Sequence, residues 1–288
     1  MKFVPFCALP LTEHIQDFAK FISSRGKLLV VTGAGVSTES GIPDYRSKDV
    51  GLYASKTSRP MEYQVFLRSH ENRQRYWARN YFGWPLFSSI RPNIAHEVIC
   101  KWEKESKIFY TVSQNVDNLH KKSGLKQLVE LHGNTHQVIC INCDFTISRH
   151  ELQEIFTELN PNFRSEIDQN KIAPDGDFII EDKLIRSFKH PDCFKCKGIL
   201  KPDIIFFGDN VPAITKELVQ TLIHTSDGLL CLGTSLEVYS SFRIVKQAHE
   251  LNIPIGIINI GKTRADDLAS YRLKGSLGYV LPKLDEII

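Results

Sequence analysis

The sequence predicts an α/β protein with a Rossmann-like, doubly wound parallel sheet, a small inserted zinc-binding domain and a helical insertion. Three observations support this fold class. Short apolar runs bounded by turn residues recur along the 288 residues. Segments with helical spacing separate several of these runs, and such alternation favours a parallel sheet covered by helices on both faces. The first run ends in a Gly-x-Gly turn, and two C-x-x-C pairs lie far apart in the second half of the chain.

Six apolar runs are expected to form buried strands. Continuous apolar runs fit strands that are buried on both faces better than strands that alternate between core and solvent. The runs are KLLVVTG (27–33), IFYTVSQ (108–114), LVELHG (128–133), IIFFGD (204–209), GLLCLGT (228–234) and PIGIINIG (254–261). Helices are expected at 12–24, 212–224 and 239–251, where the spacing of apolar residues is helical.

Two segments interrupt this alternation. Residues 55–100 carry aromatic and charged side chains with helical spacing, as in RQRYWARNYFGW, and are expected to form a helical insertion. Residues 138–201 contain both cysteine pairs and several turn signals, so they are expected to form a zinc-binding small domain. The Rossmann-like domain would then consist of 1–54, 101–137 and 202–288.

Composition narrows the class of protein. The chain is 42% hydrophobic and 24% charged, which is typical of a soluble globular protein. Its net charge of +3 is too small to indicate nucleic acid or a membrane surface as a partner, and no apolar run approaches the roughly 20 residues that span a bilayer. Glu13 and Asp17 interrupt the N-terminal stretch, which resembles neither a secretory signal nor an Arg-rich presequence. Any targeting segment is expected to have been removed or omitted.

The turn Gly33-Ala34-Gly35 has two interpretations. Glycines at this point let the backbone approach a pyrophosphate, but they also serve tight turns between a strand and a helix. The dinucleotide fingerprint has a third glycine three residues later, where this sequence has Thr38. A dehydrogenase also needs an acidic residue at a strand end about 20 residues on. Asp49 has that distance but lies in SKDVGLYASK, which is not strand-like, and this argues against hydride transfer.

The cysteines indicate a metal site. Four of the seven are paired as Cys140/Cys143 and Cys193/Cys196, the pattern of a structural tetrahedral zinc site. The 49 residues between the pairs exceed the usual spacing, so an insertion must loop out. Incidental turns or redox dithiols are the alternative. Four thiolates leave no open coordination position, so the zinc is assigned to folding, and unpaired thiols suit a reducing compartment.

Polar residues follow two of the predicted strands. Gln114, Asn115 and Asp117 come after 108–114, and His132 ends the run at 128–133. Ligands of open α/β sheets bind beyond the carboxyl ends of the strands, so these side chains are expected to converge on one ligand. His120 is the competing candidate for a catalytic histidine, although it is more typical of a loop or a helix start.

Taken together, these motifs resemble those of the sirtuin family over nearly the whole chain. GAGVSTESGIPDYRS is similar to the family's cofactor loop, SQNVDNLH to its nicotinamide and ribose motif, and ELHG to its catalytic histidine motif. LGTSLEVYS and INIG resemble its adenosine-side loops, and the cysteine pairs resemble its zinc module. Further stretches, among them RQRYWARN, NPNF and APDGD, resemble its class II mitochondrial branch. The loop 36–53 would be a mobile cover over the cofactor, which accounts for the missing third glycine.

The resemblance implies an NAD-dependent protein lysine deacylase that uses NAD and Zn²⁺. The acyl oxygen would attack the ribose carbon that bears nicotinamide, and His132 would then act as general base on the ribose hydroxyls, with a pKa near the operating pH. Nicotinamide and acyl-ADP-ribose would be released. Asn115 and Asp117 are the other residues expected to be catalytic. The NAD-binding set is Gly33, Ala34, Gly35, Thr38, Pro43, Asp44, Tyr45, Arg46, Gln114, Asn115, Asp117, His132, Gly233, Thr234, Ser235, Asn259, Ile260, Gly261 and Leu277.

The resemblance also places the substrate. The peptide is expected to add a strand between 207–211 and 236–239, with contacts to Phe207, Gly208, Glu237 and Val238.

The acyl group would be read by Tyr76 and Arg79, because an arginine fork donates two parallel hydrogen bonds to a carboxylate. We therefore expect acidic, branched or lipoyl-type acyl groups to be preferred over acetyl. The alternative is that Arg79 is a solvated helix residue and Tyr76 packs in the core.

Other functions remain open at this point. Protein mono-ADP-ribosylation would cleave the same bond of NAD, between ribose and nicotinamide, but would transfer ADP-ribose to a different acceptor. A non-catalytic NAD-binding scaffold is disfavoured by the intact His132 and Asn115. A zinc-ribbon nucleic-acid binder lacks support, because no basic and aromatic stripe accompanies the lysines around the second cysteine pair. The expected partners are acyl-lysine proteins, with metabolic enzymes among them, without nucleic acid or membrane. The resemblance implies a monomer in the mitochondrial matrix.

Overall fold

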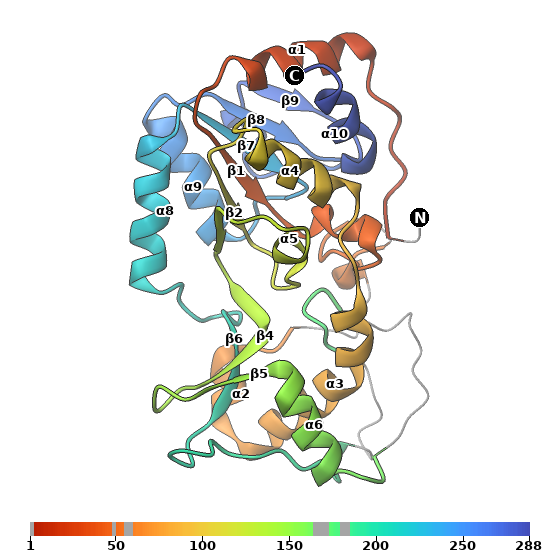
Figure 1. Cartoon of the computed structure of the whole chain (residues 1–288), viewed down its shortest axis with the longest axis vertical. Coiled ribbons are helices and arrows are strands. Elements are labelled where there is room, and N and C mark those ends of the chain that lie inside the picture. Colours follow the sequence, from red (N-terminus) through yellow and green to blue (C-terminus); the bar gives the residue numbers. More distant parts are fainter. Residues whose placement is uncertain (1–2, 48–49, 55–59, 164–172, 179–184) are drawn as a thin grey trace.

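The structure is a computed structural model that describes residues 3–47, 50–54, 60–163, 173–178 and 185–288 (Figure 1). Asp49 and parts of the ranges 55–100 and 138–201 therefore lie outside the described residues. The elements up to the first zinc ligand are α1 (Thr12–Ser23), β1 (Leu28–Thr32), η1 (Ala34–Val36), η2 (Thr38–Ser40), η3 (Leu52–Ala54), α2 (Tyr63–Arg68), α3 (His70–Ser89), α4 (Ile94–Lys104), β2 (Tyr110–Ser113), α5 (Leu119–Lys122), β3 (Leu128–Glu130) and β4 (Gly133–Cys140). The remaining elements are β5 (Thr146–Ser148), α6 (Arg149–Leu159), β6 (Leu200–Ile204), α8 (Ala213–Thr225), β7 (Gly228–Leu232), α9 (Tyr239–Glu250), β8 (Ile255–Ile258), η5 (Asp266–Leu268), β9 (Tyr271–Leu273) and α10 (Leu277–Asp285).

The larger sheet has six parallel strands in the order β3-β2-β1-β7-β8-β9. The order reverses direction at β1, where Val31 pairs with Val112 on one side and with Cys231 on the other. Every residue of β1, β7 and β8 is buried, as the continuous apolar runs predicted. The Rossmann-like parallel sheet is therefore confirmed.

One predicted strand is wrong. Of the run 204–209, only Ile204 is in a strand, and that strand (β6) pairs antiparallel with β4 in a second, three-stranded sheet. Ile204 and Phe206 are apolar because they pack in the core of the smaller lobe, against Phe66 and Tyr76, and not because they belong to the large sheet. The sixth parallel strand is instead β9, for which the sequence carries no apolar run.

Helices cover both faces of the large sheet (Figure 1). On one face, α1, α4 and α10 pack against the sheet in a single apolar cluster that includes Phe18, Trp102 and Leu281. On the other face, α8 and α9 pack through residues such as Leu222 and Val245. Because α4 belongs to this core and packs on α10, we propose that the helical insertion expected at 55–100 ends before α4.

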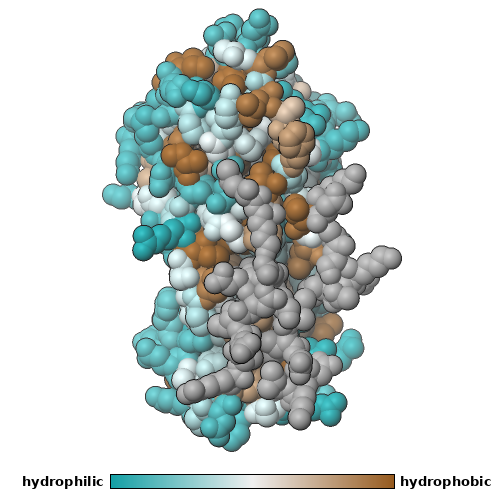
Figure 2. Space-filling view, turned by 90° about the vertical axis from the view of Figure 1, so that its right-hand side faces the viewer, coloured by the Kyte–Doolittle hydropathy of each residue, from teal (hydrophilic) through white to brown (hydrophobic). Residues whose placement is uncertain are grey.

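The smaller lobe contains the sheet β5-β4-β6 together with α6, α2 and the first part of α3 (Figure 1). Its core is strongly aromatic, and Trp77, Phe156 and Phe188 are almost fully buried in it. The fully buried Arg149 lies over the Trp84 ring, 4.8 Å from its centroid, and donates from Nε to the Asn80 side chain. The face in Figure 2 shows the larger lobe above the smaller one, with apolar side chains scattered among polar ones.

Among the described helices, none is both long enough and apolar enough to cross a bilayer.

The strand β4 connects the two lobes. It starts at Gly133, directly after His132, and reaches the first cysteine pair at Cys140. Gly133 has φ of +79°, and a Cβ there would lie 2.0 Å from the Asp203 carbonyl oxygen, so only glycine fits. This turn brings the residue before it to the crevice between the lobes.

Candidate functional site

A cavity of about 1070 Å³ lies at the carboxyl ends of the parallel strands, between them and the 205–211 segment. It is the location at which open α/β sheets bind ligands. All but one of the residues expected to contact NAD line it, and so do Phe207, Gly208, Glu237 and Val238. The exception is Pro43, which is buried beside the cavity. Tyr76 and Arg79 do not line it either.

The Gly-x-Gly turn packs against the loop after β7. The Gly35 amide donates to the Gly233 carbonyl at 2.8 Å, and a Cβ on Gly35 would lie 2.7 Å from that oxygen. A Cβ on Gly33 would meet the Thr234 side chain at 2.7 Å. The two glycines are thus required for contact between two loops, whatever ligand lies beside them. Thr38, in place of a third glycine, donates its hydroxyl to the Gly35 carbonyl within consecutive 3-10 turns, so no long helix starts here.

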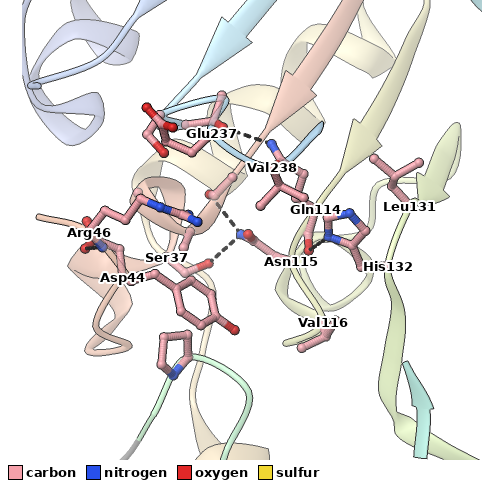
Figure 3. Close-up of a pocket in the computed structure, with 18 of the residues that line it drawn as sticks. Ser37, Asp44, Arg46, Gln114, Asn115, Val116, Leu131, His132, Glu237 and Val238 are labelled. Carbon is pink, nitrogen blue, oxygen red and sulfur yellow. Dashed lines mark hydrogen bonds between the residues drawn. The ribbon is translucent and has the colours of Figure 1, made fainter. Parts of the chain in front are cut away.

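Asn115 and Asp117 form a network with Ser37, which the sequence analysis did not identify. Asn115 Nδ2 donates to the Gly33 carbonyl at 3.0 Å and to Ser37 Oγ at 3.1 Å (Figure 3). Ser37 Oγ donates to Asp117 Oδ2 at 2.6 Å, and the Leu119 amide donates to Asp117 Oδ1. Burial raises the pKa of Asp117, while the Ser37 and Leu119 hydrogen bonds act in the opposite direction. The network fixes the glycine turn relative to the segment after β2.

His132 lies next to this network, and its ring is fixed at both nitrogens. Nδ1 is 3.1 Å from the Gln114 carbonyl oxygen (Figure 3), and Nε2 is 2.8 Å from Ser240 Oγ. Because a carbonyl can only accept, Nδ1 carries the proton and Nε2 keeps its lone pair. Burial lowers the pKa of His132 to about 4, against a smaller opposite effect of the Gln114 carbonyl. The expectation of a pKa near the operating pH is therefore wrong, because burial lowers the pKa and the Gln114 carbonyl offsets this only in part.

His120, the competing candidate, is excluded from the cavity lining. It lies in α5, near the helix start as expected, and is 3% exposed. Its Nε2 is 2.9 Å from Thr32 Oγ1. Its role is therefore in the packing beneath the site.

The loop after β7 completes the opposite wall. Gln114 Nε2 donates to Thr234 Oγ1 at 2.9 Å and to the Thr32 carbonyl, which ties this loop to β1 and β2. Thr234 in turn accepts from the Leu236 amide. The segments around Asn259 and Leu277 line the far end of the cavity.

The segment over the glycine turn is held by Asp44. Its Oδ1 accepts from the amides of Arg46 and Ser47, and its Oδ2 accepts from the Ser47 hydroxyl. Arg46 lies in the cavity (Figure 3) and its guanidinium is 5.5 Å from the centroid of the Tyr53 ring. The structure thus places a cation and a cluster of backbone turns in the same cavity as the glycine turn.

The expected acyl-reading pair occupies a different environment. Arg79 Nη2 is 2.8 Å from Asp177 Oδ2, and Nε donates to the Phe178 carbonyl at 2.9 Å. Tyr76 is 2% exposed and packs edge-on against Phe66. Pro174 and Asp175, from the same segment as Asp177, line the cavity instead, and burial raises the pKa of Asp175. These residues belong to the quoted stretch APDGD (173–177), but no contact was expected of them, because an irregular segment carries them.

The four cysteines converge in the smaller lobe. All four Sγ atoms lie within 4.8 Å of one another, with 3.5 Å between Cys140 and Cys196 and 3.7 Å between Cys143 and Cys193. A tetrahedron with Zn–S bonds of about 2.3 Å has edges of about 3.8 Å. The donor set fits Zn²⁺, and backbone amides of Asn142 and Gly198 donate to two of the sulfurs.

The chain is similar to known proteins over most of its length. The sequence model of the Sir2 family matches residues 33–240. The NAD-dependent protein deacylase Sirt4 of Drosophila melanogaster is 45% identical over 98% of this chain and 90% of that protein. The mitochondrial NAD-dependent protein lipoamidase sirtuin-4 of Homo sapiens is 47% identical, with the same coverage. A solved structure titled "Structural Basis for the Mechanism and Regulation of Sir2 Enzymes" superimposes with a TM-score of 0.73 at 25% identity, over 96% of this chain and 98% of that one.

Proposed function

The chain belongs to the Sir2 family, and on that premise we propose that it is an NAD-dependent protein deacylase acting on acylated lysine side chains. The similar proteins of Drosophila melanogaster and Homo sapiens are named a deacylase and a lipoamidase. The observation that carries the proposal is that the Nε2 lone pair of His132, the Asn115–Ser37 network and the glycine turn meet in one cavity.

The cavity fits NAD. Its volume of about 1070 Å³ slightly exceeds the usual range of ligand pockets, about 300–1,000 Å³. It extends from Gly33 past Asn115 to the loops at Gly233 and Asn259, and it contains the cation of Arg46. When bound, NAD supplies a ribose carbon that accepts the acyl oxygen as nicotinamide departs. We propose that the glycine turn and Arg46 hold the pyrophosphate and that Asn115 orients the nicotinamide half. The residues proposed for the adenosine half are Gly233, Thr234, Ser235, Asn259, Ile260, Gly261 and Leu277.

His132 is the proposed general base. Its Nε2 is unprotonated at neutral pH because the pKa is about 4, and it accepts the proton of a ligand hydroxyl. The Gln114 carbonyl continues to accept from Nδ1 in both protonation states, so the ring does not need to turn.

The substrate peptide is proposed to lie beside Phe207. The Phe207 carbonyl already accepts from the Tyr63 amide at 2.9 Å, through a parallel bridge with Glu62. A peptide strand would therefore pair on the other side of this segment, between it and the segment of Glu237 and Val238.

The acyl preference follows from the cavity wall. An acidic acyl group would have to draw Arg79 away from Asp177 and would meet Asp175, which lines the cavity. A neutral chain meets neither obstacle. We therefore propose that lipoyl-type and branched neutral acyl groups are preferred over dicarboxylic ones.

Incubation with NAD and a panel of acetyl-, lipoyl- and glutaryl-lysine peptides tests this function. We expect nicotinamide release and acyl-ADP-ribose, with lipoyl-lysine the better substrate, and we expect both products to be lost in His132→Asn. Modification of protein in place of acyl-ADP-ribose would indicate ADP-ribosylation. Unchanged turnover in His132→Asn would overturn the catalytic proposal.

The Homo sapiens and Bos taurus relatives are named mitochondrial. We propose the mitochondrial matrix as the location, with acylated metabolic enzymes as substrates and the protein acting as a monomer.

A further inference from the structure

Ser240, which also lines the cavity, contacts the proposed general base from α9. Its Oγ is 2.8 Å from His132 Nε2, although the two residues are 108 positions apart in the sequence. Ser240 is the second residue of α9 and is partly buried. Within the described part of the chain, its hydroxyl makes no other hydrogen bond. The neighbouring Ser241 is different, because its hydroxyl donates to the Val238 carbonyl of its own helix turn at 2.8 Å.

The direction of this hydrogen bond depends on the protonation of His132. In the neutral ring Nδ1 carries the proton, so Nε2 can only accept and the Ser240 hydroxyl must donate. Once Nε2 has taken a proton, it can only donate. A hydroxyl has both a donor and two lone pairs, so Ser240 can reverse the bond without moving. An alanine at position 240 could form a hydrogen bond with neither the neutral nor the protonated His132 ring.

We propose that Ser240 passes the proton to His132: its hydroxyl donates to Nε2 before proton transfer and accepts from Nε2–H afterwards. Nε2 has a single lone pair, which Ser240 already occupies, so the Ser240 proton moves to Nε2 while Oγ takes the proton of a ligand hydroxyl, and Ser240 ends with the one proton it began with. This inference rests on the proposed role of His132 as general base.

Among the residues that the structure describes, no charged side chain contributes to the pKa shift of His132. Burial lowers its pKa and the Gln114 carbonyl raises it by less. The charged residues that line the cavity are Glu39, Asp44, Arg46, Asp117, Asp175, Asp209, Lys216, Glu237, Arg243 and Lys262. Ser240 is thus the group within hydrogen-bond distance that can stabilise the charged ring at Nε2.

The first test needs no substrate. Heteronuclear NMR of the imidazole nitrogens, assigned with His132→Asn, should show Nδ1 protonated and Nε2 unprotonated at neutral pH. In Ser240→Asp we expect the pKa of His132 to rise by more than about one unit, because an adjacent carboxylate favours the charged ring. Tyr239→Asp, which places the same charge on an exposed neighbour, should produce a smaller shift. If the pKa of His132 shifts equally in Ser240→Asp and Tyr239→Asp, Ser240 does not contact the ring and the proposal is refuted.

The second test uses turnover of an acyl-lysine peptide. In Ser240→Ala we expect kcat to fall roughly ten- to hundredfold, since a hydrogen bond to a charged group is lost, while KM changes little. Ser240→Thr should restore most of kcat, and Ser241→Ala should not reproduce the loss in kcat. Thermal unfolding of each variant reports whether it is folded. If Ser240→Ala changes only KM, or keeps the wild-type kcat, the inference about Ser240 is refuted. The proposed function is tested separately by His132→Asn.

Discussion

Acid is expected to destabilise the fold through His120. This side chain is 3% exposed, its Nε2 is bonded to Thr32, and its ring centroid lies 4.9 Å from that of the buried His96. Burial lowers the pKa of His120 from 6.5 to about 4. Between these values the unfolded chain binds a proton that the folded protein does not, so stability is lost as the pH falls through this window.

The size of this effect follows from the shift. Each pKa unit corresponds to about 1.4 kcal/mol, so His120 alone accounts for about 2 kcal/mol of lost stability between pH 7.5 and pH 5, and about 3 kcal/mol below pH 4. The assay is urea unfolding of the zinc-loaded protein at pH 7.5 and at pH 5, compared with His120→Gln. The variant should be less stable at pH 7.5, but its stability should fall by about 2 kcal/mol less on acidification.

His249→Gln, at an exposed position, serves as the control and should keep the wild-type pH dependence. If His120→Gln shows the same loss between the two pH values as the wild type, burial does not lower the pKa of His120 and the reasoning is refuted.

Three further outcomes are expected. Removal of zinc by a chelator, or Cys143→Ser, should unfold the smaller lobe, with metal content and circular dichroism as measurements; an unchanged spectrum after complete zinc loss would contradict the structural role. Gly35→Ala should cost about 1–3 kcal/mol in urea unfolding, because its Cβ would lie 2.7 Å from the Gly233 carbonyl oxygen; Gly26→Ala, with 3.4 Å to its nearest neighbour, should cost less. Asp177→Asn should increase kcat/KM for glutaryl-lysine relative to lipoyl-lysine, because it weakens the hold on Arg79; an unchanged ratio would exclude Arg79 from acyl reading.

The sequence predicted the large sheet well because its strands are uniformly apolar. The runs at 27–33, 228–234 and 254–261 correspond to strands that are buried on both faces, where apolarity has a single cause. The prediction of a parallel strand at 204–209 was wrong because the apolar residues of this run pack in the core of the smaller lobe. The strand β9 was missed because two of its three residues are exposed, so no apolar run marks an edge strand.

The candidate site was predictable where a polar residue follows the end of a buried strand. Asn115 and His132 follow strand ends, so their convergence follows from the topology of a parallel sheet. Ser37, Asp175 and Ser240 lie within the quoted stretches GAGVSTESGIPDYRS, APDGD and LGTSLEVYS, but no contact was expected of them, because they reach the cavity from a 3-10 turn, an irregular segment and a helix start. The environment of Arg79 was equally hidden, since its partner Asp177 is 98 positions away in an irregular segment.

The low pKa of His132 explains why the protein needs a second group at Nε2. A base with a pKa of about 4 is unprotonated at neutral pH but takes up a proton weakly, whereas general bases work best when their pKa is near the operating pH. Aspartate at position 240 would raise the pKa of His132, because an adjacent carboxylate favours the charged ring over the neutral one that the base needs. A serine hydroxyl leaves the neutral ring intact and stabilises the charged ring when the proton arrives. Ser240 therefore suits a base that must stay neutral in the free protein and become charged during the reaction.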